Sequence, residues 1–158
     1  MSNLQPTRPR QVTQRRTFAV VASRYNYEYV QGLIENVKRE MASLSPGAVI
    51  TVYEVPGSFE IPLVVQEVAA RGGVDGILAL GVLIQGETAH AGLVAQVVTD
   101  SLQRLALHYK VPVINEVLLV ADEGQARARC LEPTLNRGVE AARAAVGMSN
   151  VLQEMRKA

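Results

Sequence analysis

The residues from Gly81 to His90 carry the clearest chemical signal in the sequence. An apolar run ends there in glycines, a hydroxyl and an imidazole (Gly-Val-Leu-Ile-Gln-Gly-Glu-Thr-Ala-His). Histidine can both accept and donate a proton near neutral pH, because its ordinary pKa lies in that range. The second histidine, His108, is expected near the end of a helix, where a cationic ring complements the helix dipole. We therefore predict a functional site around His90, with a side chain that can exchange protons there, and a structural role for His108.

The elements that must position His90 alternate between the patterns of strands and helices. Continuous apolar or β-branched runs predict buried strands, and apolar residues spaced by three and four predict the helices that cover them. The strands are expected at 17–22, 49–55, 75–81 and 111–120, and the helices around 30–41, 62–71, 93–106, 123–131 and 136–156. This order predicts an α/β fold, a flavodoxin-like three-layer sandwich with a four-stranded, mostly parallel sheet. His90 then falls at the carboxyl end of the third strand, where such sheets bind ligands.

Two helix starts are predicted in more detail. Asn26 is expected to be the N-cap of the first helix. Pro62 suits the first turn of the second helix, because the N–H that proline lacks would have no helical partner there. The buried face of that second helix is expected to carry Leu63, Val64, Val68 and Ala69.

The composition argues against nucleic acid and membranes as partners. The 158 residues fit one domain, and 16 basic residues balance 15 acidic ones to a net charge of +1. Residues 1–16 contain four arginines and no acid, which we interpret as a flexible, solvated basic arm in front of a single domain, residues 17–158, with a nucleic-acid-binding arm as the alternative. The sequence has neither a signal-type segment nor an apolar run long enough for a membrane helix, so a cytoplasmic location is expected.

Several common chemistries lack their motifs. No glycine-rich dinucleotide or P-loop motif is present, and no Gly-x-Ser-x-Gly motif occurs. The two histidines lie far apart, and Cys130 is the only cysteine, so neither a metal site nor an internal disulfide is expected. We predict no metal and no cofactor, which leaves a small-molecule site formed by the loops after the strands.

The loops after the strands form a recognisable set. They include the stretch Val-Pro-Gly-Ser-Phe-Glu-Ile-Pro at 55–62, the turn Gly-Glu-Thr-x-His at 86–90 and the run Asn-Arg-Gly-Val-Glu-Ala-Ala at 136–142. In type, order and spacing they resemble the 6,7-dimethyl-8-ribityllumazine synthase family, across residues 17–152. The resemblance implies that 5-amino-6-(ribitylamino)uracil condenses with 3,4-dihydroxy-2-butanone 4-phosphate, with loss of phosphate and water, in riboflavin biosynthesis.

The resemblance also implies roles for individual residues. His90 would move protons, while Glu87, Thr88 and Arg129 would hold the phosphate group. The pyrimidine and its ribityl chain would contact Tyr25, Ser58, Phe59, Glu60, Val82, Leu83, Ile84 and Asn115. Taken singly, these residues also have simpler interpretations. The aromatic rings could pack in the core, and Arg129 and Arg137 could be solvated charges on helices. His90 could be a hydrogen-bonded residue at the start of a helix, without a catalytic role.

The resemblance further implies self-association. Members of the family form pentamers and often hollow cages of twelve pentamers, and their site is shared between subunits. Asn115 and Arg129 would come from one subunit, and His90 and Glu60 from its neighbour. We predict a homopentamer and leave open whether twelve pentamers close into a 60-subunit cage.

The chain also departs from the family pattern at several positions. Ala91-Gly92 follows His90 where the family usually has an aromatic residue and an acid. Gln85 stands where the family usually has an arginine or a lysine, and Asn115 stands where many members have a phenylalanine. Residues 118–120 replace a run that contains a threonine in the family. These differences put substrate affinity in question and leave three alternatives: a non-catalytic flavin or lumazine binder, a chiefly structural shell protein, and an archaeal-type riboflavin synthase, which would use two lumazine molecules.

Overall fold

The computed structural model describes residues 6–157 of the chain. Its strands are β1 (Thr17–Ser23), β2 (Val49–Val55), β3 (Gly76–Ile84) and β4 (Val113–Val120). Its helices are α1 (Tyr27–Leu44), the short 3-10 helix η1 (Ser58–Glu60), α2 (Ile61–Arg71), α3 (His90–Tyr109), α4 (Glu123–Cys130) and α5 (Arg137–Lys157). The strands form one sheet in the order β2-β1-β3-β4, with every neighbouring pair parallel. The predicted α/β class and order of elements are confirmed.

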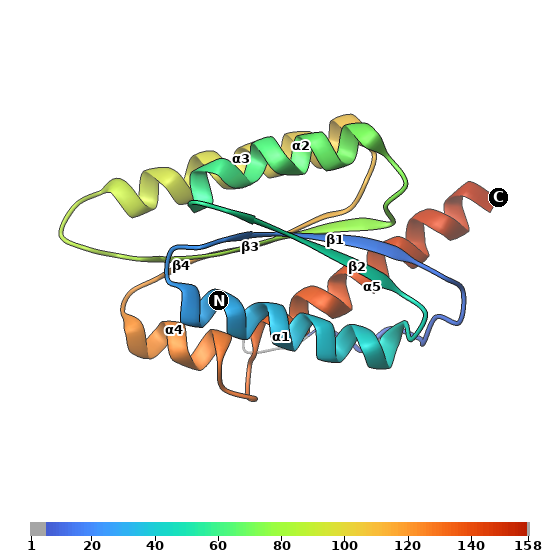
Figure 1. Cartoon of the computed structure of the whole chain (residues 1–158), viewed down its shortest axis with the longest axis horizontal. Coiled ribbons are helices and arrows are strands. Elements are labelled where there is room, and N and C mark those ends of the chain that lie inside the picture. The colour runs from blue at the N-terminus through green and yellow to red at the C-terminus, as the bar shows by residue number, and fades with distance from the viewer. Residues whose placement is uncertain (1–5, 158) are drawn as a thin grey trace.

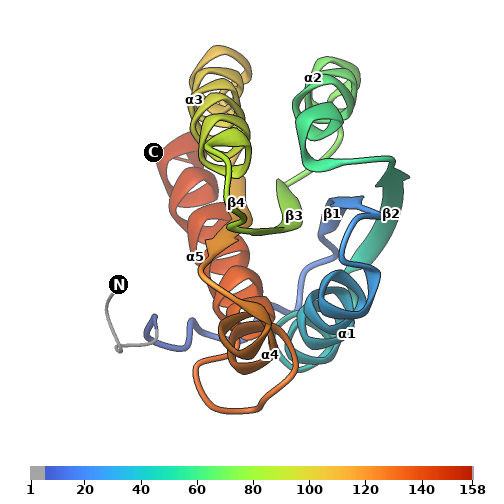
Figure 2. The ribbon, with the colours of Figure 1, turned by 90° about the vertical axis from the view of Figure 1, so that its left-hand side faces the viewer.

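The helices cover both faces of the sheet. Figures 1 and 2 show α2 and α3 on one face and α1, α4 and α5 on the other. Successive side chains of a strand point to opposite faces, so the central strand β1 supplies both cores. Val20 packs with the α1 and α5 side, whereas Val21 packs with the α2 and α3 side. None of the helices within residues 6–157 is long and apolar enough to cross a membrane.

Strand β3 extends beyond its predicted end at residue 81. Val82, Leu83 and Ile84 continue the strand because they pair with the last three residues of β4, Leu118 to Val120. Strand β1 ends earlier, since its last partner in β3 is Leu80. In the described sheet, the last residues of β3 therefore pair with β4 on one side and have no strand neighbour on the other.

Asn26 occupies the N-cap position of α1, as predicted, but its side chain does not cap the helix. The residue has a left-handed backbone, with φ of 55°, and its Nδ2 donates to the carbonyl oxygen of Val82 at 2.8 Å. Asn26 thus ties the loop after β1 to the carboxyl end of β3.

The buried face of α2 differs from the predicted one. Its buried residues are Ile61, Val65, Val68 and Ala69, whereas Leu63 is 66% exposed. Helical periodicity from Ile61 returns to the same face at residues 65, 68 and 69. Leu63 points away from this face, so its predicted burial is wrong, while Val68 and Ala69 are confirmed.

The described part of the basic arm packs against α1. Val12 is buried, and its N–H donates to the carbonyl oxygen of Leu44 at 2.7 Å. Arg8 forms an ion pair with Glu40 of α1 at 3.7 Å. Residues 1–5 of the arm and Ala158 lie outside the described residues. The flexibility of the arm and its boundary at residue 16 stay predictions.

Candidate functional site

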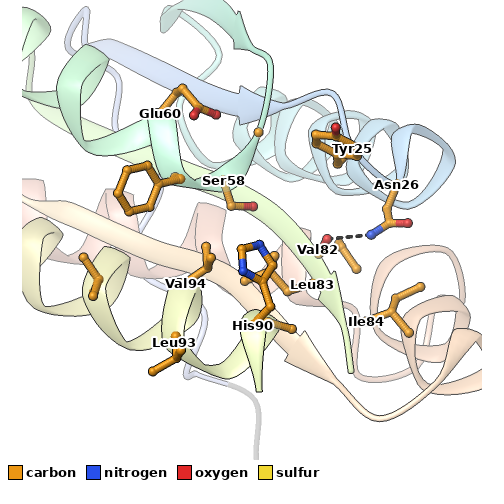
Figure 3. Close-up of a pocket in the computed structure, with 14 residues that line it drawn as sticks. Tyr25, Asn26, Ser58, Glu60, Val82, Leu83, Ile84, His90, Leu93 and Val94 are labelled. Carbon is orange, nitrogen blue, oxygen red and sulfur yellow. Dashed lines mark hydrogen bonds between the residues drawn. The ribbon is translucent and has the colours of Figure 1, made fainter. Parts of the chain in front are cut away.

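A cavity of about 810 Å³ opens at the carboxyl ends of β1, β2 and β3 (Figure 3). It is lined by Tyr25, Asn26, Gly57, Ser58, Phe59, Glu60, Val82, Leu83, Ile84, His90, Ala91, Leu93, Val94 and Val97. These residues come from four places: the loop after β1, η1 with the residue before it, the end of β3, and the first turns of α3. The size is that of an ordinary small-molecule site.

His90 is the first residue of α3 and is exposed at the cavity. Figure 3 shows its ring directed toward the side of the cavity that carries Ser58. Ser58 is buried, and within the described residues its hydroxyl has no hydrogen-bond partner. Beneath it, a Cβ at Gly81 would lie 2.7 Å from Ser58 Oγ, so a glycine in β3 lets this hydroxyl approach the strand. An imidazole and a buried hydroxyl without a protein partner together provide proton-transfer and hydrogen-bonding groups.

Two aromatic rings of the site are exposed. Tyr25 is 72% exposed and Phe59 is 62% exposed, so neither ring is ordinary core packing within this chain. Gly57 separates Tyr25 from Glu60: a Cβ there would lie 2.9 Å from the Glu60 carboxylate and 3.3 Å from the Tyr25 ring. The absence of a side chain at Gly57 therefore brings a flat apolar surface and a carboxylate together at one rim of the cavity.

The open edge of β3 adds backbone groups to the site. Beyond Leu80, β3 has lost its β1 partner, and the carbonyl of Val82 accepts from Asn26. In a strand the backbone groups of alternate residues point to the same side, so those of Ile84 face the same edge as those of Val82. This edge can donate and accept hydrogen bonds with a planar heterocycle.

Four predicted site residues do not line this cavity. Glu87 and Thr88 lie in the exposed turn between β3 and α3. Asn115 is not among the residues that line the cavity; its Nδ2 donates to Oγ1 of Thr99, further along α3, at 3.0 Å. Arg129 lies on α4, and within the described residues its buried Nη1 has no hydrogen-bond partner. A single chain therefore does not bring Asn115 and Arg129 to His90.

One ionisable group near β4 is absent from the predictions. Burial raises the pKa of Glu116 to about 7, while the charge of Arg137 lowers it and that of Glu140 raises it. A carboxyl inside the apolar run from Val113 to Val120 was the available sequence signal, since charged residues are seldom buried without a partner. Within the described residues, no group of three or more His, Cys, Asp or Glu side chains could hold a metal ion.

This geometry defines an α/β protein with a small-molecule site at the carboxyl end of a parallel sheet. A model of the family described as 6,7-dimethyl-8-ribityllumazine synthase matches residues 15–153. The chain belongs to the 6,7-dimethyl-8-ribityllumazine synthase family.

Individual members of the family align with this chain over most of their length. A 6,7-dimethyl-8-ribityllumazine synthase of Azoarcus sp. strain BH72 is 38% identical over 135 residues, 85% of this chain and 84% of the relative. The protein of the same name from Polaromonas sp. strain JS666 is 37% identical over 140 residues, 88% of each chain. That of Pyrococcus furiosus is 39% identical over 141 residues, 87% of this chain and 85% of the relative.

Proposed function

We propose that the protein is a 6,7-dimethyl-8-ribityllumazine synthase. It condenses 5-amino-6-(ribitylamino)uracil with 3,4-dihydroxy-2-butanone 4-phosphate and releases phosphate and water. The observation that carries the proposal is the shared cavity, which joins His90 to Tyr25 and to the segment Ser58–Glu60. These residues come from separate loops, and the relatives that share the family carry this activity in their names.

His90 serves as the proton-transfer group. Imine formation, phosphate elimination and ring closure each require protons to be added or removed, and an imidazole can do both near neutral pH. Within the described residues the His90 ring forms no hydrogen bond or ion pair. No acidic residue lies in the first turn of α3. The imidazole is therefore oriented by substrate and by the walls of the cavity, without a carboxylate from its own helix.

The pyrimidine substrate binds between the open edge of β3 and the aromatic rim. The ring lies against Tyr25 and hydrogen-bonds to the backbone between Val82 and Ile84. The ribityl chain extends toward Ser58 and Glu60, whose oxygen atoms match its hydroxyl groups. The Tyr25 ring and the Glu60 carboxylate are exposed, and within the described residues the buried Ser58 hydroxyl has no hydrogen-bond partner.

The phosphate binds at the start of α3. Ala89 precedes the helix and makes no side-chain cap, so the first N–H groups remain available to an anion, and the helix dipole favours negative charge there. Glu87 and Thr88 lie in the turn that leads to this terminus. Arg129 of a neighbouring subunit supplies the guanidinium, which stays charged and can bind two phosphate oxygens at once.

Assembly completes the site. Asn115 and Arg129 lie away from the cavity of their own chain, so their proposed contacts need a second copy. Exposed apolar side chains border the cavity, among them Leu93, which is 61% exposed, and Val97, which is 50% exposed. A closed five-fold ring repeats one contact between unlike surfaces, which supplies each cavity with the neighbour's residues. We propose a homopentamer in the cytoplasm and leave the 60-subunit cage open.

Turnover of both substrates tests the proposed function. The purified protein is incubated with the two substrates, and the lumazine product is followed by absorbance and fluorescence. His90→Ala should slow turnover by about 10- to 1000-fold with little change in the pyrimidine KM. His108→Ala is the matched control, because this ring packs edge-on against Tyr109 at the far end of α3.

Each alternative has its own result in this assay. Unchanged turnover in His90→Ala would remove the proton-transfer role. Tight lumazine or flavin binding without turnover would identify a non-catalytic binder, and riboflavin formed from lumazine alone would identify a riboflavin synthase.

A further inference from the structure

The loop after β1 carries one side chain that joins two walls of the cavity. Asn26 Nδ2 donates to the carbonyl oxygen of Val82 at 2.8 Å, and Figure 3 shows this hydrogen bond between the loop that bears Tyr25 and the end of β3. Tyr25 precedes Asn26 in the chain, and both line the cavity together with Val82. The ring of the pyrimidine substrate is proposed to lie between these two walls, so their separation matters for binding.

The backbone on both sides of Tyr25 is fixed by other bonds. Before it, the N–H of Arg24 donates to the carbonyl oxygen of Val55, the last residue of β2, at 2.9 Å. After it, the carbonyl oxygen of Asn26 accepts from the N–H of Tyr29 in α1 at 3.0 Å. These two bonds hold the loop to β2 and to α1, and neither reaches β3. The side chain of Asn26 supplies the link between this loop and the third strand.

The end of β3 lacks its strand neighbour on this side. The last pair between the two strands joins Ala22 of β1 to Leu80 of β3, whereas pairing with β4 continues to Ile84. A strand edge without a partner presents backbone groups that are open to another binding group. At Val82 the Asn26 amide provides a hydrogen-bond donor that β1 no longer provides.

The backbone of Asn26 suits this contact. Its φ of 55° and ψ of 46° lie in the left-handed region, which asparagine enters more readily than most residues other than glycine. The side chain does not cap α1 and reaches β3 instead. Asparagine thus combines tolerance of this backbone with an N–H donor. Glycine has the tolerance without the donor, and an ionised aspartate has the shape without the donor.

We propose that Asn26 is a positioning residue that fixes the gap between the Tyr25 ring and the backbone edge from Val82 to Ile84. A flat heterocycle can then stack on the ring and hydrogen-bond to the edge at the same time. Without the amide the two walls are no longer tied together, and contact with one wall is made at the expense of the other. The inference rests on the proposed function, because the heterocycle is the pyrimidine of the substrate or the lumazine formed from it.

Binding of 6,7-dimethyl-8-ribityllumazine tests this proposal without turnover. An aromatic ring stacked on an excited heterocycle quenches its fluorescence, so the fluorescence of bound lumazine at saturation reports its contact with Tyr25. Asn26→Gly keeps the left-handed backbone and removes the amide. It should raise the lumazine Kd about 3- to 10-fold, as expected for one lost hydrogen bond. It should also give part of the fluorescence increase that Tyr25→Leu gives.

Two further variants separate positioning from a general effect on the fold. Lys110→Gly makes the same kind of change at another left-handed residue, with φ of 54°, at the opposite end of α3 from His90. It should leave lumazine binding unchanged. Asn26→Asp has no N–H to donate at neutral pH and should weaken binding at least as much as Asn26→Gly. In turnover, Asn26→Gly should raise the pyrimidine KM by about the same factor and leave the KM of the phosphate-bearing substrate unchanged.

The outcomes separate this inference from the proposed function. Wild-type affinity and fluorescence in both Asn26 variants, or an equal loss in Lys110→Gly, would overturn the inference. If the wild type turns over its substrates while Asn26→Gly binds lumazine normally, the proposed function stands and the inference falls. Lumazine binding that depends on Asn26 without any turnover would do the reverse. A wild-type protein that binds no lumazine would overturn both.

Discussion

The free energy of unfolding should depend on Glu116 in a way that changes with pH. The pKa of Glu116 is about 7 in the folded protein, against 4.5 for an exposed glutamate. Because the folded value is the higher one, the stability that this group contributes is complete below pH 4.5 and is lost as the pH rises to 7. At about 1.4 kcal/mol per pKa unit, the loss reaches about 3 kcal/mol at pH 8.

Glu116→Gln removes this loss, since the amide has nearly the shape of the protonated acid and cannot ionise. The variant should be about 3 kcal/mol more stable than the wild type at pH 8, and only about 1 kcal/mol more stable at pH 5. Denaturant unfolding at fixed protein concentration measures both differences. Glu132→Gln, at an exposed position, should stay within about 0.5 kcal/mol of the wild type. The reasoning would be refuted if Glu116→Gln were less stable than the wild type at pH 8, or if the difference in unfolding free energy were the same at pH 5 and pH 8.

Three further predictions concern the site, the packing and the assembly. Arg129→Ala should raise the KM of the phosphate-bearing substrate by about 10- to 100-fold and leave pyrimidine affinity nearly unchanged, whereas equal weakening by calorimetry would indicate a structural role. Gly138→Ala should destabilise the fold by about 1–3 kcal/mol, since a Cβ would lie 2.6 Å from the carbonyl oxygen of Leu33. Gly147→Ala, in open space on the same helix, should be neutral or stabilising in the same unfolding experiment. Light scattering should give five or sixty times the mass of one chain, and an active monomer would contradict the shared site.

The main elements could be predicted because their signals are local. The strand 49–55 was predicted with the bounds that the structure has, since its β-branched run ends at Pro56-Gly57 and needs no distant information. The end of β3 could not be predicted in this way. Val82 to Ile84 are strand residues through pairing with β4, more than thirty positions along the chain, and no local pattern encodes that pairing.

The loop residues were predictable as a set, and their arrangement was not. The motif residues Tyr25, Ser58, Glu60 and His90 could be named from type and spacing, and the structure places them around one cavity. The side chain of Asn26 was misjudged, because asparagine before a helix usually caps it. Here the left-handed backbone turns the amide toward Val82, a contact between residues that only the parallel sheet brings together.

The sequence by itself determined the alternation of strands and helices, the parallel α/β class and the residue types available for proton transfer and anion binding. These depend on side-chain periodicity and on chemistry that each residue carries alone. Only the tertiary structure decided which residues share the cavity, that Asn115 and Arg129 lie outside it, and that Glu116 exchanges its proton near pH 7. The physical reason is that distances and dielectric environment depend on packing between segments far apart in the chain, and a pKa follows from both.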